Sequence, residues 1–222
     1  VIDRSINPRE CVDGEPWPLF TSAQLKLIDR TAIAMGTPGI QLMLRAARAV
    51  VDLVVERWQR DWSVVVVTGA GNNGGDGYLV AKLLHERGWS VTVLDLAATK
   101  YDRAADDSSE LRSEASQARR AMLRAGIVPI ALQNIAVLAT ELEKRQPMVI
   151  IDAMLGIGLQ SEPRALYLQV IEAINRSVHP VVSLLGSRST MNHYALKTDP
   201  WSAGIQMNPN THQQAASLEF IQ

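Results

Sequence analysis

Two kinds of hydrophobic pattern alternate along the middle of the chain. Short, continuous apolar runs such as residues 64–67 are typical of parallel strands covered on both faces, because a half-exposed strand alternates apolar and polar residues. Between these runs lie segments whose apolar residues recur every three or four positions, which predicts α-helices packed on one side. The predicted strands are 63–68, 90–94, 127–130, 148–152 and 180–184, and the predicted helices between them are 76–87, 107–124, 135–144 and 164–176. This alternation predicts an α/β fold, a three-layer, doubly wound sandwich around a mostly parallel, Rossmann-like sheet.

Two more helices are predicted before the first strand. Thr21 and Gln24 have the spacing of a capping box, and the helix that they open is expected to end near Gly36. Thr37 and Pro38 then supply an N-cap and a proline at the first position of a second, longer helix. Its apolar stripe is expected to cover one face of the sheet.

The regular pattern is confined to residues 21–184, which we interpret as one α/β domain. Residues 1–20 contain three prolines and little periodicity, and are interpreted as an N-terminal arm. Residues 185–222 are rich in Ser, Asn, Thr, Gln and His and show no sustained period, so they form an atypical C-terminal tail.

Composition and charge narrow the class of protein. The chain has 222 residues, of which 47% are hydrophobic and 20% charged, and this is typical of a globular domain with its own core. A formal net charge of −1 with scattered signs leaves no basic face for nucleic acid. No apolar stretch approaches the roughly 20 residues that span a bilayer, so no membrane partner is expected. One cysteine, Cys11, and no recognisable secretory signal predict a cytoplasmic protein.

Candidate chemistry is concentrated in the segment GAGNNGGDG, residues 69–77, directly after the first predicted strand. The carboxyl end of a parallel strand lies at the edge of the sheet where α/β proteins bind ligands, and the next helix presents unpaired N–H groups there. Glycine permits a close approach of the backbone to a ligand, and a phosphate fits this place. Asp76 stands where a helix N-cap belongs, so a purely structural role is its first interpretation.

Three interpretations of this segment compete. An ordinary strand-to-helix turn needs one or two glycines, fewer than the segment has. A dinucleotide-binding fingerprint G-x-G-x-x-G is present at 69–74, and Asp95 ends the next predicted strand where a ribose-binding acid belongs. This second interpretation leaves Asn72 and Asn73 unexplained, and places Gly74 before another glycine and a capping acid rather than inside a helix. A P-loop is excluded because no Gly-Lys-Ser/Thr follows.

The third interpretation is a resemblance. The strings GTPGIQLMLRAARAV (36–50), GNNGGDG (71–77), DAMLGIGL (152–159) and EAIN (172–175) occur in the order found in the NAD(P)H-hydrate epimerase family, the YjeF N-terminal domain. That family interconverts the R and S epimers of hydrated NADH and NADPH, a metabolite-repair isomerase reaction. The resemblance extends from about residue 22 to residue 184.

The resemblance implies a pocket and an ion site. The residues that would hold the hydrated dinucleotide are Asn72, Asn73, Gly74, Gly75, Asp76, Gly156, Ile157, Gly158, Leu159, Gln160, Ser161 and Glu162. Asn73 and Asp152 would be ligands of a potassium ion. The residues themselves agree with this placement, because both follow predicted parallel strands, and amide and carboxylate oxygens are the hard donors that such cations prefer.

One family motif is missing. The family continues its last matching strand into Asp-Ile-Pro-Ser-Gly, whereas this chain reads Leu-Gly-Ser-Arg-Ser at 185–189. A leucine at position 185 can neither donate nor accept a proton, so the catalytic residue is left unassigned. Three explanations stay open: a reading-frame slip after Leu184, a catalytically silent protein, or an acid supplied from elsewhere, for instance Asp76 or Asp199.

The sequence therefore supports three functions. The first is an NAD(P)H-hydrate epimerase with a potassium cofactor, the second a catalytically silent binding or scaffold module of the same fold, and the third a redox enzyme with an NAD-binding Rossmann domain. If the tail supplies no further strands, the sheet ends at an open edge, and a homodimer would cover it.

Overall fold

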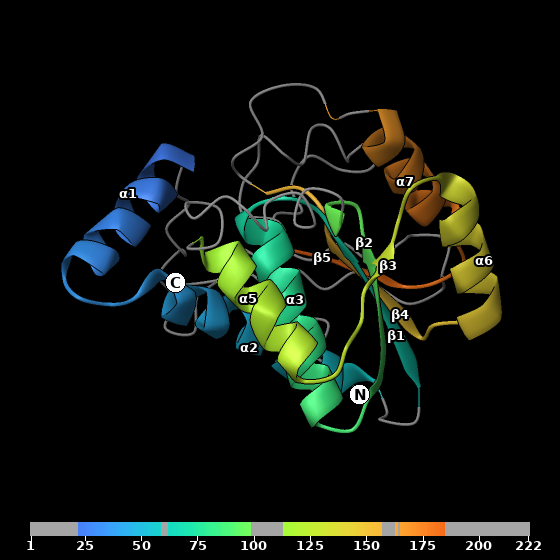
Figure 1. Ribbon diagram of the computed structural model, residues 1–222, viewed down its shortest axis with the longest axis horizontal. Coiled ribbons are helices and arrows are strands. Elements are labelled where there is room, and N and C mark those ends of the chain that lie inside the picture. The colour runs from blue at the N-terminus through green and yellow to red at the C-terminus, as the bar shows by residue number, and fades with distance from the viewer. Residues whose placement is uncertain (1–21, 59–61, 99–112, 157–162, 164, 185–222) are drawn as a thin grey trace, which may run out of the picture.

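The computed structural model describes residues 22–58, 62–98, 113–156, 163 and 165–184 (Figure 1). The N-terminal arm and the C-terminal tail lie outside the described residues. Helices and strands alternate from β1 onward, as the hydrophobic pattern predicts. In chain order the elements are α1 (Ser22–Ala34), α2 (Gly39–Arg57), β1 (Ser63–Thr68), α3 (Asn72–Glu86), β2 (Ser90–Asp95), α5 (Glu114–Arg124), β3 (Ile130–Ala131), α6 (Ile135–Arg145), β4 (Val149–Ala153), α7 (Ala165–Arg176) and β5 (Val181–Ser183).

The described strands form one parallel sheet with the order β3-β2-β1-β4-β5. The chain starts at β1 in the centre, runs outward through β2 to β3, and then returns to the other side of β1 to form β4 and β5. The order reverses between β1 and β4, so these two strands define the topological switch point of the sheet. The predicted doubly wound α/β fold is confirmed.

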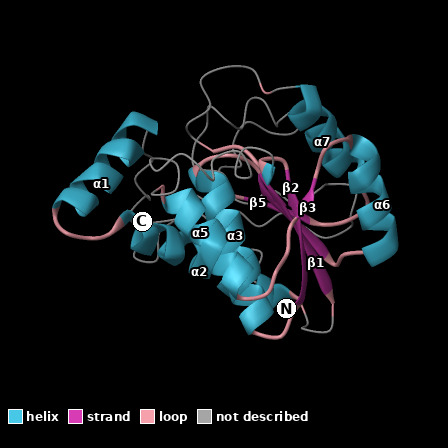
Figure 2. Ribbon diagram, in the orientation of Figure 1, coloured by secondary structure: helices cyan, strands magenta, loops and turns pink. Residues whose placement is uncertain are grey.

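Helices cover both faces of the sheet. Helices α2, α3 and α5 lie on one face, and α6 and α7 lie on the other (Figures 1 and 2). Successive valines of β1 face opposite layers: Val64 and Val66 join the core under α2 and α3, whereas Val65 and Val67 join the core under α6 and α7. A strand between two helical layers has no solvent face, which explains its unbroken apolar run.

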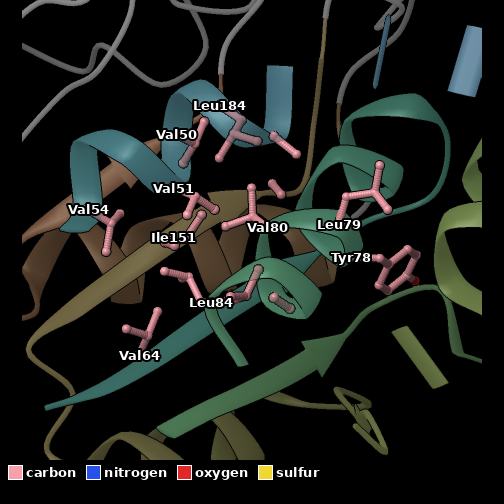
Figure 3. Close-up of a cluster of buried hydrophobic side chains, with 14 of the residues drawn as sticks. Val50, Val51, Val54, Val64, Tyr78, Leu79, Val80, Leu84, Ile151 and Leu184 are labelled. Atoms are coloured by element: carbon pink, nitrogen blue, oxygen red, sulfur yellow. The ribbon is translucent and has the colours of Figure 1, made fainter. Parts of the chain in front are cut away.

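The larger core lies between the sheet and the layer that contains α2 and α3. Side chains of both helices meet the strands there, with Val51 of α2, Val80 of α3 and Ile151 of β4 close together (Figure 3). Each of these three side chains is at most 1% exposed. Burial of a side chain of this size stabilises the fold by roughly 2 kcal/mol, so this core fixes how α3 leaves the sheet.

The start of α3 differs from the prediction. The helix begins at Asn72, not at Asp76, and its N-cap is Gly71. Gly71 has φ +93, a conformation that glycine adopts without strain, and it turns the chain into the helix directly after β1. Asp76 therefore lies inside the helix, and its predicted role as the N-cap is wrong.

The ends of several other helices and strands differ from the predicted ends by a few residues. Pro38, not Thr37, is the N-cap of α2, and no side chain caps this helix end. Helix α5 begins at Glu114 after the N-cap Ser113, while residues 107–112 of its predicted range lie outside the described part. Strand β3 spans Ile130–Ala131 rather than residues 127–130, because Ile130 and Ala131 are the residues that pair with β2. Gly88, two residues after the end of α3, adopts a left-handed conformation with φ +83.

Helix α1 differs from the other helices because it does not cover the sheet. Its closest neighbour is α2, and Figure 1 draws it beyond the α2–α3–α5 layer. No residue of α1 whose side chain is described is fully buried. Within the described parts of the chain, no helix combines the length and the apolar character needed to cross a membrane.

Candidate functional site

The segments that carry the candidate chemistry meet at the switch point of the sheet. Strands β1 and β4 pair in register, with Val67 opposite Asp152 and Thr68 opposite Ala153. The glycine-rich segment leaves the carboxyl end of β1, and residues 154–156 leave the carboxyl end of β4. Because the strands are parallel and adjacent, both segments emerge at one edge of the sheet, where α/β proteins bind ligands.

Direct contacts hold the two segments together. The backbone N–H of Gly69 donates to the Ala153 carbonyl at 3.2 Å, and Asn73 Nδ2 donates to the Leu155 carbonyl at 2.9 Å. Gly156 lies so close to Asn73 that a Cβ on it would be 3.1 Å from the Asn73 Cβ. Asn73 and the segment that follows Asp152 are therefore parts of one site.

Most glycines of the segment are needed for packing inside the protein. A Cβ on any of four of them would come closer than 3.0 Å to another atom: Gly69, Gly74, Gly75 and Gly77. A Cβ on Gly69 would press on the Met154 carbonyl oxygen, and one on Gly77 would lie 2.5 Å from the Ala153 Cβ. The glycine content thus lets α3 start close to β4, a role that the sequence does not distinguish from close approach to a ligand.

Asp152 is a buried carboxylate at the end of β4. It is 4% exposed, and its two oxygens accept hydrogen bonds from Met154 N at 3.0 Å and from Ser183 Oγ at 3.3 Å. Burial raises the pKa of Asp152 to about 6, although both hydrogen bonds lower it. Within the described residues these two donors are neutral, and a buried carboxylate supported by neutral donors favours a nearby cation.

Ser183 was not singled out from the sequence. It ends β5 directly opposite Asp152 in the strand register, and it is 7% exposed. A polar residue at the carboxyl end of an otherwise apolar strand was the available signal, because such ends converge at the ligand edge of the sheet.

Asn73 occupies the second position of α3 and is oriented by its hydrogen bond to Leu155. Because Nδ2 is the atom that donates, Oδ1 is turned away from that carbonyl, and an amide oxygen can accept a hydrogen bond or bind a cation. Asn72, the first helical residue, is exposed at the same helix end. The first-turn N–H groups have no intrahelical acceptor, and together with the helix dipole they favour an anion here.

Asp76 follows one turn later in α3 and keeps part of its surface in solvent. Desolvation, and then repulsion from the Asp29 carboxylate of α1, raise the pKa of Asp76 to about 8. Asp76 is therefore mostly protonated at neutral pH. Nothing in the sequence pattern links these two residues, since they lie on separate helices.

Tyr167 connects the glycine-rich segment to the opposite helical layer. Its hydroxyl oxygen accepts a hydrogen bond of 3.3 Å from the backbone N–H of Ala70. Tyr167 lies in the first turn of α7, so this bond fixes the position of the segment between β1 and α3. It too was not identified from the sequence.

Asp95, the candidate ribose-binding acid, is already engaged by the protein. It is 1% exposed, and its carboxylate accepts hydrogen bonds from Ala97 N at 2.8 Å and from Arg119 Nε at 3.4 Å. A ribose hydroxyl requires an accessible carboxylate, so the geometry does not favour the redox interpretation. One argument used against that interpretation is nevertheless wrong, because Gly74 does lie inside the helix.

We expect Arg119→Met to destabilise the protein by about 2 kcal/mol at pH 7, because a buried carboxylate loses its cationic partner. Burial already raises the pKa of Asp95, and Arg119 lowers it. Without Arg119 the pKa rises further, so the loss should shrink as the pH falls and Asp95 becomes protonated. Urea denaturation at pH 7 and at successively lower pH measures both the loss of stability and its decrease with pH.

The matched control is Arg176→Met. Arg176 pairs with Glu172 at 3.3 Å on the surface of α7 and its side chain is 80% exposed, so the change should be below about 0.5 kcal/mol at every pH. A pH-independent loss in Arg119→Met would contradict the assigned role of the Arg119–Asp95 pair.

Several predicted residues lie outside the described part of the chain: Ile157, Gly158, Leu159, Gln160, Ser161, Glu162, Leu185 and Asp199. Among the residues that are described, no group of three or more His, Cys, Asp and Glu could hold a metal ion. The donors at this site are instead one carboxylate, one amide and one hydroxyl, which are oxygen ligands of the kind that alkali cations accept.

Comparisons with known proteins agree with the fold and extend over most of the chain. Residues 39–184 match the family model described as "YjeF-related protein N-terminus". The NAD(P)H-hydrate epimerase of Limosilactobacillus fermentum is 32% identical over 166 residues, which cover 74% of this chain and 72% of that protein. The NAD(P)H-hydrate epimerase of Limosilactobacillus reuteri (strain ATCC 55730 / SD2112) is 34% identical over 170 residues, 75% of this chain and 71% of that protein.

A longer relative and a solved structure extend the comparison. The bifunctional NAD(P)H-hydrate repair enzyme Nnr of Coxiella burnetii is 32% identical over 75% of this chain, but the match spans only 31% of that enzyme. The crystal structure of yeast ynu0 superposes with a TM-score of 0.61 at 20% identity, covering 76% of this chain and 70% of the yeast chain. At this identity the yeast structure supports the fold alone.

Proposed function

The chain belongs to the family of YjeF-related protein N-termini, and from this premise we propose that it is an NAD(P)H-hydrate epimerase, which interconverts the R and S epimers of hydrated NADH and NADPH. The observation that carries the proposal is the hydrogen bond from Asn73 to Leu155, which joins the two family segments at the switch point of the sheet. The reaction is a metabolite-repair isomerisation.

The dinucleotide would bind at the carboxyl ends of β1 and β4. Its phosphates are negatively charged, and the amino end of α3 offers N–H groups from Asn72 onward as well as the positive end of the helix dipole. Gly156, next to Asn73, begins the segment through Glu162 that the family resemblance assigns to the phosphates. The nucleotide-binding role of these residues is part of the proposal.

We also propose a potassium ion at Asn73 and Asp152, with Ser183 beside them. Asp152 supports this, because a carboxylate that is 4% exposed is stabilised by a cation more than by neutral donors alone. The Asn73 Oδ1 atom supplies a second hard oxygen ligand. Such an ion would provide a fixed positive charge that holds the two segments in place beside the anionic substrate.

The chemistry at the nicotinamide requires reversible loss and return of the hydroxyl at C6. Hydroxide is a poor leaving group, so a protein acid must protonate it, and a pocket that excludes bulk water must hold the ring meanwhile. The family position for the acid holds Leu185 in this chain. This departure keeps a second candidate open, a binding module of the same fold that does not turn over.

The direct test is chiral chromatography of hydrated NADH with and without the protein. The proposal predicts that an R or S epimer equilibrates faster with the protein than the spontaneous reaction allows, and that the rate rises when potassium replaces sodium. An unchanged rate together with saturable binding of the hydrate in calorimetry would support the binding module instead. A protein that showed neither turnover nor binding would overturn both the epimerase and the binding module.

Self-association and compartment are part of the proposal as well. In the described part of the chain β5 is an edge strand, and a second copy could cover this edge. A stable monomer in size-exclusion chromatography with light scattering would overturn the homodimer. The cytoplasmic location stays a prediction, which microscopy of the tagged protein would check.

A further inference from the structure

Tyr167 of α7 contacts the glycine-rich segment, although α7 and the helix α3 that follows this segment lie on opposite faces of the sheet (Figure 1). We propose that Tyr167 is a positioning residue for the pyrophosphate of the dinucleotide, and that its hydroxyl holds the turn at Ala70 in a fixed conformation before the phosphates bind. This inference rests on the proposed dinucleotide site and adds to it a residue of the other helical layer.

Residues 70–73 form a short turn that is tied to other segments at both of its ends. At one end the backbone N–H of Ala70 donates to the Tyr167 hydroxyl oxygen at 3.3 Å. At the other end Asn73 Nδ2 donates to the Leu155 carbonyl at 2.9 Å. The turn includes the first residue of α3, where the N–H groups have no intrahelical acceptor. The two bonds together therefore set where these N–H groups lie.

Packing explains the ring of Tyr167 but not its hydroxyl. The ring is partly buried and packs against the core cluster under α6 and α7, which contains Met154 and Val170. A phenylalanine at this position would bury the same ring, and burial of apolar surface is what stabilises such a core. The hydroxyl adds the bond to Ala70 N, so a phenylalanine variant isolates the contribution of that bond.

The exposure of Ala70 indicates that the bond matters more for ligand binding than for stability. Ala70 is exposed, so without the Tyr167 hydroxyl its N–H would bond to water at little cost to the free energy of unfolding. The next residue is Gly71, which has φ +93, and glycine loses more conformational freedom on ordering than any other residue. A ligand that had to order this turn itself would lose affinity, because the ordering cost is subtracted from the binding free energy.

The part of the substrate that depends on this turn is the pyrophosphate. The amino end of α3 favours an anion, and the pyrophosphate is the anionic group that NADH and NADPH hydrates share. Tyr167 acts on it through the backbone of Ala70 and not on the nicotinamide ring. Loss of the hydroxyl should therefore weaken the binding of any ligand that carries this pyrophosphate, and should leave the chemistry at C6 almost unchanged.

The test uses ADP-ribose, which carries the pyrophosphate but no nicotinamide, with the full-length protein and potassium present. In calorimetry, Tyr167→Phe should weaken the binding of ADP-ribose about 10-fold, because the ligand must then order the turn. In epimerisation of hydrated NADH the same variant should raise KM about 10-fold and keep kcat within about twofold. A merely structural role of the hydroxyl would instead lower the fraction of active protein, and with it kcat, while KM and the ADP-ribose affinity stayed the same.

Ser63→Ala is the matched control. Ser63 begins β1, at the end of the strand opposite to the turn, and its Oγ donates to the Arg145 carbonyl at 2.9 Å. The variant thus also removes one hydroxyl hydrogen bond between segments that are far apart in the sequence. Its affinity for ADP-ribose and its KM should match those of the unmodified protein. An equal loss of affinity in Ser63→Ala and Tyr167→Phe would trace the effect to a general loosening of the fold and would overturn the inference.

Amide hydrogen exchange of the ligand-free protein, followed by NMR, measures the bond directly. The Ala70 amide should exchange at least about 10-fold faster in Tyr167→Phe, while the Gly69 amide, which donates to the Ala153 carbonyl, should not change.

The possible results separate this inference from the proposed function. Unchanged ADP-ribose affinity in Tyr167→Phe, or failure of the unmodified protein to bind ADP-ribose, would overturn the inference. Weaker ADP-ribose binding in Tyr167→Phe, in a protein that does not epimerise, would support the inference and overturn the epimerase. Failure of the unmodified protein to bind hydrated NADH as well as ADP-ribose would overturn both.

Discussion

Asn73→Ala is expected to reduce epimerisation by at least about 100-fold while the protein remains folded. The side chain is assigned two tasks: Nδ2 holds Leu155 at 2.9 Å, and Oδ1 is the proposed ligand of potassium. Alanine removes both. Loss of one side-chain hydrogen bond destabilises a protein by only about 1 kcal/mol, so the effect on activity should far exceed the effect on stability. Initial rates over a potassium titration and urea denaturation measure the two quantities.

Asn134→Ala is the control that separates a role at the candidate site from the mere loss of one side-chain hydrogen bond. Asn134 caps α6, where its Oδ1 accepts from Val137 N at 3.2 Å, and it has no assigned role at the site. Removal of this cap should also destabilise the protein by about 1 kcal/mol, and turnover should not change. If Asn73→Ala retained the rate and the potassium response of the unmodified protein, Asn73 would have no part in the ion site.

The pattern of apolar residues was sufficient to predict the architecture of the fold. The run at residues 64–67 identified a strand covered on both faces, and its valines do divide between the two cores. The helices could be predicted because burial of one face leaves a period in the sequence, and the strands because burial of both faces leaves a continuous apolar run. The boundaries were less accurate where backbone geometry decides: Gly71, the N-cap of α3, lies five residues before the acid that looked like the cap.

The site could be predicted only in part. Asn73 and Asp152 were singled out through the family resemblance, and their predicted places at the ends of parallel strands agreed with it, because such strands end at a common edge. Ser183 and Tyr167 were missed, because their roles depend on strand register and on a helix of the opposite layer.

The glycines of residues 69–77 also show how far the site can be predicted from the sequence. Their number suggested a close approach of backbone to ligand, yet Gly69 and Gly77 are confined by β4 and its following carbonyl. A sequence reports that a side chain is excluded, but it does not report which atom excludes it. The two roles are compatible here, because the contact that excludes a Cβ also brings the loops after β1 and β4 together.

Gly69→Ala is accordingly expected to produce the largest loss of stability, about 4 kcal/mol. A Cβ at this position would overlap the Met154 carbonyl oxygen, which belongs to the backbone and cannot move like the end of a flexible side chain. Relief requires the segments after β1 and β4 to separate, and this breaks the bond from Gly69 N to the Ala153 carbonyl. Epimerisation should be lost together with stability. Urea denaturation and thermal unfolding measure the change.

Gly36→Ala is the control that makes this result specific. Gly36 has φ +97, but a Cβ on it would have no atom within 4 Å, so alanine there should destabilise the protein by only about 1 kcal/mol through backbone strain. A loss several-fold larger in Gly69→Ala would locate the effect in the contact between the two loops. If the two variants lost equal stability, the close contact between the segments after β1 and β4 would no longer account for the glycine at position 69.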